Sequence, residues 1–383
     1  MAVAQGQQRQ NAGCGETARR VEKWFAATAR DLPWRRQRTP YGTLVSEAML
    51  QQTQVSRVAA AWVSFMLKFP SVVALAAAGE AQTVRAWRGL GYYRRARQLH
   101  AAALVICKKH HAEVPSAHAD LCSLPGIGPY SAGAIASIAF GQRQAIVDGN
   151  VARVMMRIHG RNVDRDSAVG KRWLWKQARD YVDSARSPGS ANEGLMELGA
   201  MICTPVSPRC GECPVRALCA AKKMGVQECI PTARKRPVKQ VLHSHVVIAS
   251  VGGRRALVRR STRGLWAGQL FPPSIESLRA ISLSALARRL EVSGSGLAMA
   301  GAFAFETTHR SVRFRVWIAS PSASKVLKEA NGERWRWFAP RQIVDASVSS
   351  AMTRVFEVAD AYCAHACCAA ATARQRRVPS VAR

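Results

Sequence analysis

The chain has 383 residues, of which 48% are hydrophobic, so it is long and apolar enough for two domains with separate cores. Its 56 Lys and Arg outnumber 24 Asp and Glu, and the formal charge of +32 points to a polyanionic partner, most often nucleic acid. No apolar run is long enough to span a membrane, and the polar first residues do not resemble a signal peptide, so we expect a cytoplasmic protein without membrane contacts.

The first part of the chain is expected to be helical. Residues 1–16 are polar and are expected to be disordered. Residues 17–33 carry apolar side chains at helical spacing, and similar segments without strand alternation continue to about residue 222. We predict an all-α domain over residues 17–230, followed by a basic, proline-containing linker over 231–240.

The segment Thr43–Val55, TLVSEAMLQQTQV, holds the first candidate site residue. A glutamate in a helix is usually solvated, but Glu47 has apolar neighbours. Burial among them would raise its pKa and keep it protonated near neutral pH. The amides of Gln51 and Gln52, which follow, are suited to contact base edges.

A glycine-framed pair of tyrosines, Gly89–Tyr93, is followed by Arg94, Arg95 and Arg97. Aromatic side chains beside arginines are suited to insertion into a duplex, with the arginines anchoring phosphates. A helix–helix turn with two packing tyrosines has the same composition.

Residues 124–130, LPGIGPY, form a glycine-rich turn before a small-residue apolar run. That run is expected to be a buried helix closed by Gly141. Gly126 and Gly128 permit positive φ and close backbone approach, so amides at the helix N-terminus are available to a DNA phosphate. Taken alone, the same residues also fit an ordinary turn.

Asp148 comes soon after this helix and precedes Gly149 and Asn150, so it is a candidate helix N-cap, a candidate catalytic carboxylate, or both. The glycine-rich turn, the buried helix and the aspartate that follows resemble the signature of the helix-hairpin-helix DNA glycosylase superfamily, which implies cleavage of an N-glycosidic bond. Breaking that bond builds positive charge on the sugar, which an ionised carboxylate stabilises, and the leaving purine needs a proton from a carboxylic acid. Glu47 and Asp148 fit the acid and the carboxylate, and Asn150 is expected to hydrogen-bond the pair.

Four of the 11 cysteines lie close together, and their spacing is typical of a metal site. They are Cys203, Cys210, Cys213 and Cys219. Four thiolates in one short loop hold either a zinc ion or a cubane iron–sulfur cluster. Zinc ribbons usually have two Cys-x-x-Cys knuckles, and only one is present here.

After the linker, strand-like runs occur at residues 245–250, 255–258 and 312–318, with a helix candidate over 278–290. We predict an α+β domain over residues 241–362 and a basic tail over 363–383 that is disordered at its end.

These motifs together resemble the MutY family of adenine glycosylases, within the helix-hairpin-helix DNA glycosylase superfamily. The resemblance implies a 4Fe–4S cluster on the four cysteines and Glu47 as the catalytic acid and base. It implies that Tyr92 is a wedge inserted beside an oxidised guanine. Bifunctional members of the superfamily carry a lysine where this chain has Tyr130, which implies a monofunctional glycosylase with Tyr130 orienting the catalytic groups.

The resemblance extends to two further regions. Residues 192–205 resemble the family segment that leads into the cluster, and Glu197, together with Arg35, is expected in the base pocket. Residues 263–272 resemble the MutT-like (Nudix-like) domain at the MutY C-terminus, here without a Glu-rich box, which implies a binding module. Thr308 and His309 stand at the family's Ser-His recognition loop, where the preceding phenylalanine is absent.

We therefore expect a monomer that flips adenine out of double-stranded DNA and removes it opposite 8-oxoguanine or guanine. An endonuclease III-like glycosylase/lyase for oxidised pyrimidines is one alternative, and Tyr130 argues against it. A non-catalytic iron–sulfur DNA-binding protein is another, and the presence of both Glu47 and Asp148 argues against that.

Overall fold

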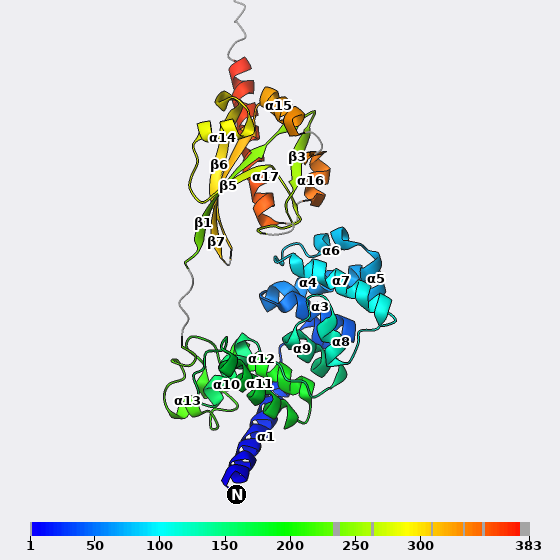
Figure 1. Cartoon of the computed structure of the whole chain (residues 1–383), viewed down its shortest axis with the longest axis vertical. Helices are drawn as coiled ribbons and strands as arrows, with labels where there is room; N and C mark the ends of the chain where they lie inside the picture. The colour runs from blue at the N-terminus through cyan, green and yellow to red at the C-terminus, as the bar shows by residue number, and fades with distance from the viewer. Residues whose placement is uncertain are drawn as a thin grey trace, which may run out of the picture. The chain divides into compact units, whose positions relative to one another are not determined.

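The structure is a computed structural model that describes residues 2–232, 238–261, 264–307, 309–331, 334–346 and 349–375. The chain separates into two compact units, Met1–Lys235 and Arg236–Arg383. The first unit is helical, and the second holds all the described strands (Figure 1). The predicted fold class, an all-α domain followed by an α+β domain, is confirmed. Within the described ranges, no helix has the length and apolar character needed to cross a membrane.

The elements of the helical unit follow in chain order. They are α1 Ala2–Thr28, α2 Pro33–Arg36, α3 Pro40–Leu50, α4 Val55–Lys68, α5 Val72–Ala77, α6 Glu80–Ala86, α7 Arg94–Lys109, α8 His118–Ser123, α9 Pro129–Phe140, α10 Gly149–Ile158, α11 Ala168–Asp183, α12 Pro188–Met201, the 3₁₀ turn η1 Cys210–Glu212 and α13 Ala220–Lys223.

The first helix begins earlier than the sequence led us to expect. α1 starts at Ala2, where we expected disorder over residues 1–16. Cys14, Ala18, Val21 and Phe25 are buried along one face of α1, which packs on α11 and α12. The helical spacing therefore continues N-terminally from residue 17 to Cys14, within a stretch whose overall composition is polar.

The small-residue helix α9 lies at the centre of the helical unit. It packs against α3, α8 and α12, and Gly141 closes it in the left-handed conformation at φ 67°, as predicted. A Cβ on Gly133 would lie 2.3 Å from the Ala145 carbonyl oxygen, so glycine is required where the segment leading to Asp148 crosses the helix. The small residues of α9 thus let the site-bearing elements approach one another.

The elements of the α+β unit also follow in chain order. They are β1 Gln240–Ile248, β2 Ser250–Val251, β3 Arg254–Arg259, β4 Leu270–Phe271, β5 Ser274–Ser277, α14 Leu283–Leu290, the 3₁₀ turn η2 Gly294–Gly296, β6 Leu297–Glu306, β7 Arg310–Ala319, α15 Pro321–Asn331, β8 Arg336–Phe338, α16 Pro340–Ala346 and α17 Ser350–Gln375.

The larger sheet of this unit has the strand order β5-β1-β7-β6, with β1 parallel to β7 and the other pairs antiparallel. The smaller sheet contains β2, β3 and β4, and β8 pairs with β3. One apolar core joins the larger sheet to α17, and a second joins its opposite face to α14 and α15. The expected strands are present, and the expected helix over 278–290 is shortened to α14.

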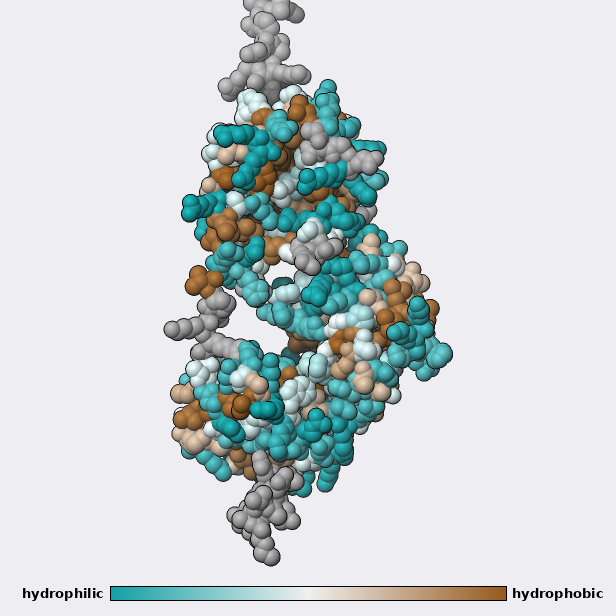
Figure 2. All heavy atoms as spheres, viewed as in Figure 1, coloured by the Kyte–Doolittle hydropathy of each residue, from teal (hydrophilic) through white to brown (hydrophobic). Residues whose placement is uncertain are grey.

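The ends of the second predicted domain differ from expectation. α17 packs on β6 and β7 through Met352, Val355 and Ala359, and it continues to Gln375, past the predicted start of the tail at residue 363. Residues 376–383 of the predicted tail and 233–237 of the predicted linker lie outside the described residues. Hydrophilic side chains cover most of the surface in Figure 2, and hydrophobic ones form small separate groups.

Candidate active site

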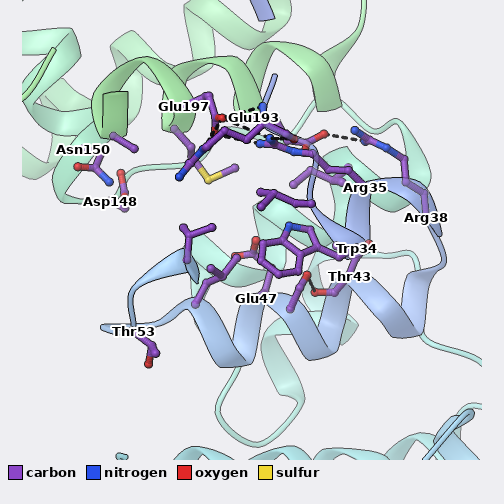
Figure 3. A pocket seen from close by; sticks show the side chains of 18 of the residues that line it. Trp34, Arg35, Arg38, Thr43, Glu47, Thr53, Asp148, Asn150, Glu193 and Glu197 are labelled. Carbon is purple, nitrogen blue, oxygen red and sulfur yellow. Dashed lines mark hydrogen bonds and ion pairs between the residues drawn. The ribbon is translucent and has the colours of Figure 1, made fainter. Parts of the chain in front are cut away.

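A cavity of about 200 Å³ lies within the helical unit, lined by residues of α2, α3, α9, α12 and the start of α10. Six residues that we predicted from the sequence line it together: Arg35, Glu47, Tyr130, Asp148, Asn150 and Glu197. Figure 3 shows Glu47 on α3 across the pocket from Glu193 and Glu197 on α12, with Asp148 and Asn150 at one side. The helical fold therefore collects residues that are up to 162 positions apart in the sequence into one site.

Glu47 projects from an almost wholly buried helix. Thr39 caps α3 by accepting a hydrogen bond from the Gly42 amide, and Pro40 occupies the first turn. The Glu47 side chain is buried among apolar residues of α3. Burial, followed by the nearby charges of Glu193 and Asp148, raises the pKa of Glu47 to about 8, although its contact with Tyr130 lowers it.

Asp148 is the N-cap of α10, and its Oδ1 accepts a hydrogen bond of 2.7 Å from the Val151 amide. Burial raises its pKa, while the amides of Val151 and Asn150 and the charge of Arg153 oppose that rise. Both interpretations of Asp148 therefore apply, since it caps a helix and also lines the pocket. The amide donors favour its ionised form, whereas no amide contributes to the pKa of Glu47.

Asn150 is held by a buried arginine. Its Oδ1 accepts a hydrogen bond of 2.9 Å from Arg153 Nη2, which also donates to the Gly199 carbonyl at 2.8 Å. Arg153 Nε donates to the Cys203 carbonyl at 2.7 Å. We expected the Asn150 side chain to bond the two carboxyl groups; instead its backbone amide interacts with Asp148 and its side chain with Arg153.

The α12 wall of the pocket is a network of buried ion pairs. Glu197 binds Arg30 at 2.6 Å and Arg35 at 3.1 Å, and Glu193 binds Arg35 at 2.9 Å and Arg38 at 2.6 Å. Burial alone would raise the pKa of Glu197, but the hydrogen bonds from Arg30 and Arg35 lower it to about 2. Sequence reasoning missed Glu193, although its spacing of four residues from Glu197 places both on one helix face.

The four predicted cluster cysteines converge beyond the end of α12. All four are half-buried and free of disulfides. Burial above all, and the nearby Cys203, Cys219 and Cys210, raise the pKa of the Cys213 thiol to about 12. Four thiolates that lie close together and half-buried repel one another, and a positively charged iron–sulfur core would balance their charge. Four cysteine thiolates contributed by one short loop are the ligand set of a 4Fe–4S cluster, and these four thiols fit it.

Comparison with known proteins agrees with this site. Residues 45–177 match the HhH-GPD superfamily of base excision DNA repair proteins, and residues 203–219 match the iron–sulfur binding domain of endonuclease III. The adenine DNA glycosylase of Homo sapiens is 33% identical over 397 residues, which cover 88% of this chain and 72% of that protein. The chain belongs to the adenine DNA glycosylase family. It is a DNA repair enzyme with a 4Fe–4S cluster.

Two further comparisons cover about half of the chain. The adenine DNA glycosylase of Mycolicibacterium smegmatis is 44% identical over 194 residues, covering 50% of this chain and 65% of that protein. The structure of a thermostable thymine-DNA glycosylase is 27% identical with a TM-score of 0.51, covering 56% of this chain and 98% of that chain. The residues that match the HhH-GPD superfamily all lie in the first unit.

The tyrosine loop of this adenine DNA glycosylase family member is tied to α3 by Arg95. Arg95 is buried, and its Nη1 donates to the carbonyls of Ala48 at 2.9 Å and Met49 at 2.8 Å. Its Nη2 donates to the Leu90 carbonyl at 3.2 Å, and its guanidinium lies 5.4 Å from the Tyr92 ring centroid. We expected Arg95 to anchor a phosphate; it instead fixes the Tyr92 loop against the helix that carries Glu47.

Tyr92 and the predicted amide contacts lie at or near the surface of the helical unit. Tyr92 is 48% exposed, with φ 47°. Gln52 is exposed, whereas Gln51 is half-buried and donates to Ser131 Oγ at 3.2 Å. Gln51 therefore joins α3 to α9, while Gln52 and Tyr92 remain accessible.

The glycine-rich turn uses its two glycines differently. Gly126 has φ 81°, and a Cβ there would meet the Gln98 side chain at 2.7 Å. Gly128 is the N-cap of α9 with φ −98°, so only Gly126 adopts the positive φ that both glycines permit. A Cβ on Gly128 would meet no atom within 4 Å, so this position is open to a partner.

The predicted lesion-recognition pair belongs to the α+β unit. His309 is exposed between β6 and β7, and its carbonyl accepts a hydrogen bond from the Gln240 amide at 3.3 Å. Thr308 lies outside the described residues.

Proposed function

We propose that this glycosylase hydrolyses the N-glycosidic bond of adenine opposite 8-oxoguanine, or opposite guanine, in duplex DNA, without cleaving the strand. The observation that carries the proposal is the pairing of two buried carboxyl groups of unlike acidity in one pocket. Glu47 has a pKa of about 8 and so holds a proton at neutral pH. Burial raises the pKa of Asp148, but its amide hydrogen bonds and the charge of Arg153 oppose that rise and favour the ionised form.

Each carboxyl group has a separate role in the proposed reaction. Glu47 protonates a ring nitrogen of the extruded adenine, which makes the base a better leaving group. Asp148 stabilises the positive charge that develops on the sugar as the bond breaks. Glu47, once deprotonated, activates the attacking water. Tyr130 orients Glu47, since its hydroxyl interacts with that carboxyl.

The remaining pocket residues hold the base and keep the pocket rigid. Arg35 lies between Glu193 and Glu197, so its guanidinium is fixed by two carboxylates. Because Glu197 is almost fully occupied by Arg30 and Arg35, we assign it to shaping the base pocket through these arginines. Asn150, fixed by Arg153, positions the start of α10 and therefore Asp148.

The pocket composition supports a monofunctional enzyme. A glycosylase that also cleaves the strand uses an amine, commonly lysine, to form a Schiff base with the sugar. Among the described residues that line the pocket, none is a lysine, and Tyr130 occupies the position after the glycine-rich turn. Water is therefore the proposed nucleophile.

Binding to the duplex is assigned to accessible groups outside the pocket. Tyr92 inserts as a wedge, Gln52 contacts base edges beside it, and Gln51 supports that contact through Ser131. The amides around Gly126 and Gly128 bind a phosphate at the α9 N-terminus. Thr308 and His309 read the base opposite the adenine.

Cys203, Cys210, Cys213 and Cys219 are assigned as the cluster ligands. The group would supply a rigid, positively charged centre that orders residues 203–219. Arg157 donates to the carbonyl of Thr204 at 2.7 Å and lies 3.3 Å from Cys203 Sγ, so it supports the loop. A visible absorption spectrum with iron–sulfur charge-transfer bands, lost in Cys210→Ser, tests the assignment.

The test of the function uses labelled duplexes with adenine opposite 8-oxoguanine, guanine or thymine. We expect free adenine from the first two duplexes, and strand breaks only after alkaline treatment. Strand cleavage without alkali, or turnover of a thymine glycol duplex in place of adenine, would indicate the bifunctional alternative. Binding without any base release would contradict the catalytic roles of both carboxyl groups.

A further inference from the structure

One half of the larger sheet has an open face that carries positive charge. In the parallel pair of β1 and β7, His243 lies opposite Arg313 and His245 lies opposite Arg315. Residues opposite one another on neighbouring strands point to the same face, and the residues between them point to the other face. The register therefore places two histidines and two arginines on one side of the two central strands.

The opposite face of these strands belongs to the core. Val312 and Phe314, which alternate with the arginines, are buried against the core that includes α17. Arg313 is exposed and Arg315 is half-buried. The core under α14 and α15 begins further along β1 and β7, at Val247 and Trp317. In Figure 1 the start of β1 and the start of β7 extend past α14 and α15.

The edge strand beside the arginines leaves them accessible. β6 places Ala304 opposite Arg313 and Ala302 opposite Arg315, and both alanines are exposed. Short side chains leave the neighbouring guanidinium groups free to extend over the sheet. The result is a flat surface, which we call the open sheet face, formed by His243, Ala302, Ala304, Arg313 and Arg315.

Among the described residues, the positive charge of this face is balanced only in part, by Glu306, whose pKa the charge of Arg313 helps to lower. Among the described residues, no carboxylate lies within ion-pair distance of Arg313 or Arg315. The carboxylate of Glu306, on the same face, is bound by Lys239 at 2.7 Å and by Ser311 Oγ at 2.7 Å. Burial first, and then the charges of Arg315 and His243, lower the pKa of the adjoining His245 to about 4, as expected where cations are crowded.

We propose that the open sheet face binds the phosphate backbone of duplex DNA, on the flank of the base read by His309. The part that concerns His309 rests on the proposed function. Guanidinium groups bind phosphate oxygens through two parallel hydrogen bonds. Arg313 and Arg315 follow His309 along β7 by about 13–20 Å at the usual rise of a strand. That length corresponds to roughly four to six base-pair steps of a duplex.

The experiment compares two charge-matched double variants of the full chain. Arg313→Gln with Arg315→Gln removes the two arginines of the open sheet face. Arg288→Gln with Arg289→Gln removes two exposed arginines from α14 in the same unit. The dissociation constant for a plain duplex, without a mispair, is measured from about 50 to 200 mM salt, because each phosphate contact contributes roughly 0.9 to the slope of log affinity against log salt.

We expect the open-face variant to bind more weakly and to lose roughly 2 from that slope, while the α14 variant keeps the wild-type slope. Equal losses in both variants, or no loss in either, would overturn the proposal. Thermal melting checks folding, since both pairs of positions tolerate a polar side chain at the surface. The plain duplex involves no base removal, so a failure of the proposed adenine activity would appear separately in the release assay.

Discussion

The two walls of the catalytic pocket bury carboxyl groups in opposite ways. On α3, Glu47 is buried with no cation bound to it and with Glu193 and Asp148 nearby, and its pKa rises to about 8. On α12, Glu197 is at least as deeply buried, but Arg30 and Arg35 bind it, and its pKa falls to about 2. Burial acts in the same direction on both groups, so the counter-ions decide the difference between an acid and a permanent anion.

This difference makes the walls respond to pH in opposite directions. Stability from Glu197, whose pKa is lowered, is present above its unfolded pKa of about 4.3 and is lost as pH falls toward 2. Stability associated with Glu47, whose pKa is raised, is present below about 4.3 and is lost as pH rises through about 8. The ion-paired carboxylates of α12 thus stabilise the pocket at neutral pH, while Glu47 on α3 keeps a proton that it can donate.

Glu47→Gln removes the acid while leaving the pocket shape nearly unchanged. We expect adenine release under single-turnover conditions to fall by about 10²–10⁴-fold, since proton donation to the base is lost. Duplex affinity should stay within a few-fold of wild type. Glu16→Gln, at a half-buried glutamate of α1 outside the pocket, is the control and should leave the rate unchanged. Near-normal release by Glu47→Gln would remove the proton-donor role.

Glu197→Gln tests the α12 wall, where the carboxylates are ion-paired. The change leaves Arg30 and Arg35 without their shared carboxylate, and breaking a buried ion pair from one side typically costs about 3–5 kcal/mol. We expect a clear fall in Tm at pH 7 that diminishes as the pH approaches 2. Glu16→Gln, which breaks only surface pairs with Arg19 and Arg20, should leave Tm almost unchanged. Equal Tm losses in the two variants would show that the α12 network adds little stability.

Glu47, on the α3 wall, should give the reverse pH dependence of stability. The folded protein retains a proton on Glu47 that the unfolded chain releases, so its stability falls by about 1.4 kcal/mol per pH unit between about 4.3 and 8. Glu47→Gln has no such proton. We therefore expect the Tm of this variant to rise relative to wild type from pH 5 to pH 8. A constant Tm difference over that range would mean that Glu47 is ionised in the folded protein.

The sequence predicts the first wall of the pocket better than the second. Glu47 stands out because a carboxyl group interrupts an apolar run, and Asp148 because it precedes a turn before a helix. Glu193 lies on α12, whereas the arginines that bind it lie in and just after α2, so their contact depends on the tertiary fold. The chain has 56 Lys and Arg, and no feature of the neighbouring sequence distinguishes the arginines that become buried.

Arg95 illustrates the same limit. Beside two tyrosines it looks like a phosphate anchor, yet its neighbour Arg94 is exposed while Arg95 is buried beneath the tyrosine loop. The position of α7 against α3 decides which of these adjacent arginines faces solvent. The end of α9 and the start of α10, by contrast, follow from local signals, Gly141 and the N-cap Asp148, and both were predicted correctly, whereas the start of α1 and the end of α17 were not.

Tyr130→Phe makes the smallest change affecting the α3 wall. The Tyr130 hydroxyl lowers the pKa of Glu47, so its removal should raise that pKa further. Adenine release requires protonated Glu47 and should decline above about pH 8 in the wild type. In Tyr130→Phe we expect this decline to move to higher pH by less than about one unit, the scale of a single hydrogen bond.

Met196→Leu is the matched control for that shift. The Tyr130 hydroxyl lies 3.0 Å from Met196 Sδ, so this variant removes the other contact of the hydroxyl and leaves its interaction with Glu47 in place. Its pH profile should therefore coincide with that of the wild type. A shift to lower pH in Tyr130→Phe, or equal shifts in both variants, would show that packing, and not the hydrogen bond to Glu47, sets the acidity of this wall.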